Sequence, residues 1–413
     1  MKILHISTMS KGGAFLAANR LNDALIAHNI ESKILVLETP GENTNAIPYL
    51  KHSNSFLYKL FYKLKKSILY RFKIGIGKYW RKHDSIREKE PCIYSFPIST
   101  FRVENHQLVK QWADIIHLHW CNNFINYPTF FKCINKPIVW TFHDISFKYG
   151  GFHFDIDFKR HYQAYCELED ALFKIKEKAL RNKSNITLLA LSKEIKHEIE
   201  SVSYLSNKQI ILLPNIINTK DFIVLDKQEC RKYLKIVNKK VIIFVSENVD
   251  TESKGLNDLK IAVRGIFNND DILLCIVGNF IKKDNSNDLN LLYTGKISDS
   301  NILNMYYSAA DILVVPSYQE SFSLTTFESM SCGTPVVAYP CGAITEYINE
   351  NNGILCKTKD PNELKKCIQK ALSINYNPYL IRNHIVNQIN PEILVPKYML
   401  LYNKIEKDQL LFS

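Results

Sequence analysis

Residues 2–36 read KILHISTMSKGGAFLAANRLNDALIAHNIESKILV, and this stretch decides the fold class. The apolar run at 2–7 predicts a buried strand, and the polar, glycine-containing residues 8–13 predict a loop. A helix follows, and residues 32–36 predict a second strand. This β–loop–α–β opening favours an α/β protein whose parallel sheet is covered by helices on both faces.

The same rhythm returns along the rest of the chain. Further strands are predicted at 114–120, 137–141 and 186–191, and a second series with VIIFVS, DILLCIVG, LLYTG and DILVVPS begins near residue 240. We therefore predict two doubly wound, Rossmann-like domains, at 1–205 and 206–392, with a C-terminal helix at 393–413 that packs back toward the N-terminal domain. Because open parallel sheets bind ligands at the carboxyl ends of their strands, two facing sheets predict a cleft.

The composition narrows the class of protein. With 413 residues, 46% of them hydrophobic and 23% charged, the chain has enough apolar content for two cores, which excludes disorder and coiled coil as the main architecture. The formal charge of +12 predicts an anionic partner.

None of the ten cysteines forms a Cys-x-x-Cys pair, which favours reduced thiols over zinc sites or disulfides. No apolar run approaches the ~18 residues of a membrane span, and the N-terminus turns polar too soon for a signal peptide, so we expect a cytoplasmic protein.

Two carboxylates eight residues apart form the strongest local pattern. Glu320 is predicted in a loop after a buried strand, and Glu328 about one turn into the next helix. The first N–H groups of that helix, near Ser323, Leu324 and Thr325, are suited to hold a diphosphate. A carboxylate beyond them would accept hydrogen bonds from ribose hydroxyls. The alternative is that Glu328 is a surface helix residue and Glu320 a cap.

Two weaker patterns lie in the N-terminal half. The Gly12-Gly13 loop suits close approach to an anion, although a plain turn is the alternative. It is not a G-x-G-x-x-G fingerprint, and this argues against an NAD-dependent oxidoreductase. His117 and His119 have a spacing that metal ligands use, but with no third ligand or paired cysteine in view we expect a cleft-lining or core role and no metal.

Seven motifs occur in order along the chain. They are Gly12-Gly13, DIIHLHW (114–120), WTFHD (140–144), Leu-Ser (191–192), Leu-Pro-Asn (213–215), Lys-Gly (254–255) and the block YSAADILVVPS…E-x7-E…SCGTPVVA (307–338). Together they resemble the family 4 retaining glycosyltransferases of the GT-B fold. The Leu-His-Trp and WTFHD segments are most similar to bacterial exopolysaccharide enzymes of the colanic-acid and O-antigen types. The resemblance spans residues 1–40 and about 110–390.

The resemblance implies roles for residues of the C-terminal domain. Glu328 would bind the ribose of a nucleotide sugar, and Glu320 would contact hydroxyls of the transferred sugar. Lys254 would neutralise the diphosphate as it departs.

It also implies roles in the N-terminal domain. His143 would steady the sugar near its anomeric centre, while Gly12 and Gly13 would let this domain close against the phosphates. The sugar would be transferred with retention and without a metal, the leaving phosphate assisting the acceptor hydroxyl. The nucleotide sugar is a substrate, so no cofactor is expected.

The chain departs from the family pattern at two places. The family commonly has an arginine before the Lys-Gly pair, but FVSENVDTESK (244–254) contains none. One cation therefore stands where two are usual. The Pro-Asn-Gly-x-Asp pattern appears as PNIIN (214–218), without its glycine.

A basic stretch outside the resemblance accounts for most of the net charge. Residues 51–83 contain ten Lys/Arg and no Asp or Glu, and apolar side chains recur at helical spacing between 56 and 72. Residues 53–82 are thus predicted to form a helix that lies on an anionic membrane surface. The alternative is a solvated helix whose apolar face packs on its own domain. Nucleic-acid binding is not expected, because no recognised motif accompanies the charge.

These observations favour a peripheral, cytoplasmic hexosyltransferase of exopolysaccharide or lipopolysaccharide biosynthesis. It would move a sugar from a nucleotide sugar to a saccharide or lipid-linked saccharide acceptor. Two alternatives stay open. One is a GT-B sugar-nucleotide epimerase, which would not need the basic helix. The other is a catalytically silent GT-B protein that serves as a binding partner in a synthesis complex.

Overall fold

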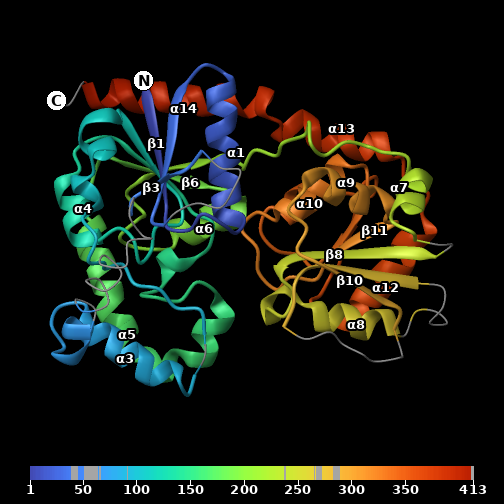
Figure 1. Ribbon diagram of the computed structural model, residues 1–413, viewed down its shortest axis with the longest axis horizontal. Helices are drawn as coiled ribbons and strands as arrows, with labels where there is room; N and C mark the ends of the chain where they lie inside the picture. The colour runs from blue at the N-terminus through green and yellow to red at the C-terminus, as the bar shows by residue number, and fades with distance from the viewer. Residues whose placement is uncertain are drawn as a thin grey trace. The chain divides into compact units, whose positions relative to one another are not determined.

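The chain folds into two compact units, which the computed structural model in Figure 1 displays from blue to red along the sequence. One unit comprises Met1–Leu213 with Lys397–Ser413, and the other comprises Pro214–Pro396. The structure describes residues 1–38, 45–50, 64, 67–90, 92–236, 239–264, 266, 272–281 and 289–410. Most of the first half of the predicted basic helix, 53–63 and 65–66, lies outside the described residues.

The first unit is built on a parallel sheet of seven strands in the order β3-β2-β1-β4-β5-β6-β7. The strands are β1 (Lys2–Ser7), β2 (Glu31–Val36), β3 (Ile47–Pro48), β4 (Ile115–Leu118), β5 (Ile138–Thr141), β6 (Ile186–Ala190) and β7 (Gln209–Leu212). All residues of β4, β5 and β6 are buried, as expected where helices cover both faces of a parallel sheet.

Helices connect these strands and complete the first core. They are α1 (Gly13–Ala27), α3 (Gly77–Arg87), α4 (Tyr127–Cys133), α5 (Asp155–Leu180), α6 (Lys193–Glu200), the short turns η1 (Val103–Asn105), η2 (Leu108–Trp112) and η3 (Ser146–Lys148), and the C-terminal α14 (Pro391–Leu410). The core is rich in aromatic side chains from α4, β5 and the loops after β5, such as Phe130, Trp140 and Phe152.

The second unit repeats the plan with six parallel strands in the order β10-β9-β8-β11-β12-β13. The strands are β8 (Lys240–Asn248), β9 (Ile272–Asn279), β10 (Leu291–Gly295), β11 (Ile312–Val315), β12 (Val336–Ala338) and β13 (Gly353–Leu355). Its helices are α7 (Lys227–Tyr233), η4 (Glu252–Lys254), α8 (Leu256–Arg264), α9 (Ser300–Ala309), α10 (Leu324–Ser331), α11 (Ile344–Tyr347), α12 (Pro361–Ser373) and α13 (Pro378–Ile389). Figure 1 shows α9 and α10 on one face of this sheet and α8 and α12 on the other.

Two Rossmann-like, parallel-sheet units confirm the predicted fold class. The units divide at Leu213/Pro214 and Pro396/Lys397, whereas the sequence suggested 205/206 and 392/393. The first difference arises because β7 is an edge strand of the first sheet, paired with β6. The second arises because α14 begins in one unit and ends in the other, where Tyr402 hydrogen-bonds to His117 of β4.

The basic stretch does not form one continuous helix. Lys73 and Gly75 have φ angles of 54° and 53°, which end the helical run that includes residues 67–71, and α3 begins afresh at Gly77. Among the described residues, no helix combines the length and the apolar character that a membrane crossing requires.

Candidate functional site

Lys254 and Glu320 meet at the carboxyl ends of β8 and β11. Lys254 ends the turn η4, and its Nζ lies 2.7 Å from Glu320 Oε1, with 32% and 15% of the two side chains exposed. Gly255 makes this approach feasible, because its φ is 71° and a Cβ there would lie 2.0 Å from the carbonyl oxygen of Pro316. The Lys-Gly pair thus places a partly buried cation directly beside the Glu320 loop.

A second glycine holds the backbone of the Glu320 loop. Gly342 has φ 52°, and a Cβ on it would lie 2.0 Å from the Glu320 carbonyl oxygen. The next residue, Ala343, donates its N–H to the carbonyl of Ser321 over 3.2 Å. The loop is therefore fixed from the chain segment that follows β12, which sequence reasoning did not identify.

Glu328 is a buried residue of α10. Only 3% of it is exposed, and its Oε2 accepts a hydrogen bond of 3.0 Å from Tyr307 Oη on α9. The alternative of a solvated surface residue is therefore wrong. Ser323, and not Glu320, occupies the N-cap position of this helix.

The first turn of α10 lies beside these carboxylates. The Ser323 side chain makes no capping hydrogen bond; its hydroxyl accepts one of 2.9 Å from Thr326 Oγ1 and lies 3.2 Å from Thr325 Oγ1. The positive end of the helix dipole is suited to an anion. Of the predicted site residues, Lys254, Glu320, Ser323, Leu324, Thr325 and Glu328 all belong to this second unit.

The first unit contributes Gly12, Gly13 and His143. Gly12 precedes α1 with φ 86°, a conformation that favours glycine. A Cβ on Gly13 would meet no atom within 4 Å, so packing inside the protein does not require glycine there. That open space beside the start of α1 leaves room for a ligand to approach the backbone.

His143 is the outer end of a row of three imidazole rings. It follows β5, and its Nε2 lies 3.0 Å from Nδ1 of His119, which follows β4. His119 Nε2 lies 3.0 Å from Nδ1 of His5 in β1. His5 and His119 are 0% and 4% exposed, so this row runs from a partly buried ring into the core.

His117 stands beside this row in a different set of contacts. Its ring nitrogens bond to Tyr402 Oη (2.7 Å) and Thr141 Oγ1 (2.8 Å). The structure brings His5 to His117 and His119 with ligand atoms within 4.8 Å of one another, so it supplies the third ring that the sequence analysis did not find. However, the rings of His117 and His119 are stacked 4.3 Å apart at 26°, so their lone pairs lie side by side rather than converging.

Burial keeps all four rings neutral. Loss of solvent lowers the pKa of His5 to about 3 and that of His143 to about 4, and it lowers the pKa of His117 and His119 well below the usual value. At neutral pH each ring therefore offers one N–H donor and one acceptor nitrogen.

These shifts predict a pH-dependent stability of the first unit. The folded-state pKa values lie below the unfolded value of about 6.5, so the stabilisation is complete above that pH and is lost as the pH falls toward 4. One such histidine contributes at most about 1.4 kcal/mol per pH unit, and we expect a steeper loss of stability from pH 6.5 to 5 because four contribute.

All four tryptophans, at 80, 112, 120 and 140, lie in this unit, so urea unfolding followed by their fluorescence measures its free energy of unfolding. Unchanged stability over this range would contradict the neutral, buried state, and replacing the exposed His197 with Gln should leave the slope unchanged.

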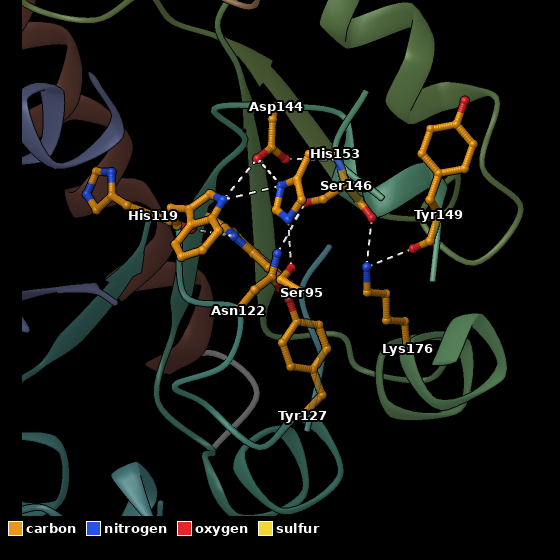
Figure 2. Close-up of polar contacts among 11 residues, drawn as sticks. Ser95, His119, Asn122, Tyr127, Asp144, Ser146, Tyr149, His153 and Lys176 are labelled. Carbon is orange, nitrogen blue, oxygen red and sulfur yellow. Dashed lines mark hydrogen bonds and ion pairs between the residues drawn. The ribbon is translucent and has the colours of Figure 1, made fainter. Parts of the chain in front are cut away.

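Asp144 follows His143 in the chain, and Figure 2 shows its carboxylate beside His153 and Ser146. Its Oδ2 accepts hydrogen bonds from Trp120 Nε1 (3.0 Å) and His153 Nδ1 (2.6 Å), and its Oδ1 accepts one from the N–H of Ser146 (2.9 Å). Burial alone would raise the pKa of this carboxyl, but His153 and the bonds from Ser146 outweigh burial and hold the pKa below its usual range. Asp144 thereby fixes the backbone next to the proposed sugar-binding histidine.

His153 also contacts Ser95, whose Oγ lies 2.7 Å from its Nε2. This is the connectivity of a Ser-His-Asp triad. Yet Ser95 is only 3% exposed, and its N–H and that of Phe96 are already bonded to Gly151 O and Asn123 Oδ1. A nucleophilic serine would need access to a substrate and free oxyanion donors. The hydrogen bonds that join Ser95, His153 and Asp144 therefore stabilise the loops that carry these residues.

The comparisons with known proteins concern the second unit and the overall fold. Residues 226–387 match the family model described as Glycosyl transferases group 1. An uncharacterized glycosyltransferase of Methanocaldococcus jannaschii is 26% identical over 296 residues, 68% of this chain and 70% of that protein. Several other curated relatives are matched over less than a fifth of their own length.

Solved structures share the fold over nearly the whole chain. Anabaena HepE in complex with UDP and glucose has a TM-score of 0.65 at 14% identity, covering 98% of this chain and all of that chain. WaaG, a glycosyltransferase involved in lipopolysaccharide biosynthesis, has a TM-score of 0.56 at 15% identity and covers 94% of both chains. The fold is thus of the GT-B type. The family model matches residues of the second unit.

Proposed function

We propose that this protein is a retaining hexosyltransferase that uses a nucleotide sugar as donor. The observation that carries the proposal is the Lys254–Glu320 pair at the strand ends of the second unit. Glu320 lies in the loop that leads into the first turn of α10. The segment matched by the group 1 family model includes all of these residues. The solved complex of HepE with UDP and glucose supports a donor of this class.

The proposed roles of these residues follow from the charges of their side chains. Lys254 and the N–H groups at Ser323, Leu324 and Thr325 would hold the diphosphate, so that positive charge from the protein replaces a metal ion. Glu328, with one oxygen bonded to Tyr307, would accept hydrogen bonds from the ribose. Glu320 would exchange its contact with Lys254 for hydroxyls of the transferred sugar. In the first unit, Gly12 and Gly13 would contact phosphate, and His143 would contact the transferred sugar.

A thermal-shift screen tests the donor site. At 100 times its dissociation constant, a bound nucleotide adds about 2.7 kcal/mol of stability. We expect one of UDP, GDP, CMP, dTDP or their sugars to raise the melting temperature of the wild type and to fail with Glu328→Ala. Replacing the exposed Glu350 of the same unit with alanine should preserve the shift. Stabilisation that survives Glu328→Ala would refute the assignment of the ribose site.

Turnover separates this function from its alternatives. A silent binding partner would bind the nucleotide without consuming the sugar donor. An epimerase would convert the nucleotide sugar with no acceptor present. A transferase releases the nucleoside diphosphate only as sugar is transferred, to an acceptor or slowly to water.

We further propose that the acceptor is a lipid-linked saccharide of surface polysaccharide assembly, reached at an anionic membrane surface. The support is an exposed apolar cluster within the basic stretch: Leu64, Ile68, Phe72 and Ile74 are 53–66% exposed. Among the described residues, none of these four side chains belongs to the first core or packs against it, whereas Tyr79 and Trp80 of α3 do pack against it. Arg71 and Lys73 are exposed in the same segment, a charge pattern suited to anionic lipid.

Vesicle binding tests this surface. We expect the wild type to sediment with vesicles containing anionic lipid and to be released by salt. Replacing Ile68 and Phe72 with serine should lower the partition coefficient at least tenfold, because burying one such side chain is worth about 1.5–3 kcal/mol. The matched control is Leu380→Ser, which changes a 58% exposed residue of α13. Equal binding of both variants would eliminate this segment as the membrane contact.

A further inference from the structure

The row of rings that ends at His143 has a property that no single ring possesses. Both contacts, from His143 to His119 and from His119 to His5, join two ring nitrogens 3.0 Å apart. Two neutral nitrogens form a hydrogen bond only when one carries the proton and the other a lone pair. Because His119 uses both of its nitrogens, it donates at one and accepts at the other.

The two hydrogen bonds of the row therefore share one donor-to-acceptor direction. If His5 donates to His119, then His119 donates to His143, and the proton of His143 lies on Nδ1. If His143 donates from Nε2, the order reverses, and its Nδ1 carries a lone pair. The inner end, His5 Nε2, is buried with no hydrogen-bond partner among the described residues, so nothing described there disturbs the order.

The row is also held rigidly. The backbone N–H of His119 donates to Ile6 O over 3.0 Å, and its carbonyl accepts a bond of 3.2 Å from Trp140 Nε1. His5 is paired in register with His117 between β1 and β4. No described residue hydrogen-bonds to His143 Nδ1, so this nitrogen is the outward end of the row.

We propose that His119, backed by His5, is a positioning residue that fixes the ring orientation and the tautomer of His143. His143 Nδ1 then meets a hydroxyl of the transferred sugar with one defined hydrogen-bonding character. A hydroxyl both donates and accepts, so an unsupported ring would bind it in mixed orientations. The sugar contact rests on the proposed function, whereas the tautomer does not.

Nitrogen NMR tests the tautomer directly, because protonated and unprotonated ring nitrogens have distinct shifts. The samples are full-length protein labelled at the histidine rings, at pH 7 with chelator present. The His143 signals are assigned by their loss in His143→Gln. We expect the wild type to show a single neutral tautomer of His143. His119→Leu should give a mixture of tautomers or a reversed one, and His119→Gln, whose amide still bonds to Nε2, should restore a single form.

A second variant provides a control in case His119→Leu does not fold. His5→Leu removes only the inner ring and should also release the tautomer of His143, while the exposed His197→Gln should not. If the His143 shifts are the same in wild type and in folded His119→Leu or His5→Leu, the positioning role is refuted. A doubly protonated His143 in the wild type would refute it as well.

Donor turnover tests the contact with sugar separately. We expect His119→Leu to lower kcat about tenfold, with recovery to within about threefold in His119→Gln. A changed tautomer with unchanged turnover would overturn the sugar contact while leaving nucleotide binding by the second unit intact. Nucleotide stabilisation that is absent in the wild type, or that survives Glu328→Ala, would instead count against the proposed function itself.

Discussion

Replacing Lys254 with alanine is expected to lower kcat for donor turnover by about 10²–10³-fold. Residues 244–253 contain no arginine, so Lys254 is the only cation of the β8–η4 segment 244–254 that can face the departing diphosphate. A fixed charge at a site of developing negative charge is worth about 2.7–4 kcal/mol in the transition state. Its 2.7 Å contact with Glu320 keeps the ammonium group in place before the donor binds. The measurement is steady-state release of the nucleoside diphosphate from the donor identified by thermal shift.

The matched control changes a lysine with similar surroundings. Lys296 is 45% exposed and lies 3.5 Å from Glu247, in the same unit. Its replacement with alanine should change kcat less than twofold, because an exposed pair contributes little. A loss below tenfold in Lys254→Ala would mean that another group stabilises the diphosphate. No loss at all would remove Lys254 from the proposed stabilisation of the diphosphate, whereas a wild type without donor turnover would favour the silent-partner alternative.

Replacing Asp144 with alanine is expected to destabilise the first unit by about 3–5 kcal/mol. The change leaves Trp120 Nε1, His153 Nδ1 and the N–H of Ser146 without their acceptor in a buried setting, and removal of one partner of a buried pair has costs in this range. Because the loops that Asp144 joins also hold His143, turnover should fall even at temperatures where the protein stays folded. Urea unfolding followed by tryptophan fluorescence measures the effect in this unit alone.

Glu167→Ala is the control for Asp144→Ala. Glu167 pairs with Lys82 on the surface, where the two side chains are 78% and 38% exposed, so its loss should change the free energy of unfolding by less than about 1 kcal/mol. If Asp144→Ala is no more destabilising than Glu167→Ala, the carboxylate does not brace these loops.

Short apolar runs predicted most of the strands, because the residues of such a run are consecutive in the chain. Residues 2–7 were expected as a strand and form β1, and 311–316 contain β11. Apolar character alone does not predict the burial of single side chains: Leu16 and Ile26 of α1 are 40% and 45% exposed. The basic helix was overextended, because positive φ angles at Lys73 and Gly75 interrupt it.

The sequence by itself determined the α/β class and the two-unit plan, because a βαβ unit is a local structure. The residues proposed to carry the donor chemistry were named from the resemblance to a known family of glycosyltransferases. Only the tertiary structure decided which of them meet. Lys254 and Glu320 are 66 residues apart, Tyr307 reaches Glu328 from another helix, and His5 joins His119 across a separation of 114 residues. Such contacts depend on strand order and register, which arise from the packing of the whole sheet rather than from any short stretch of the chain.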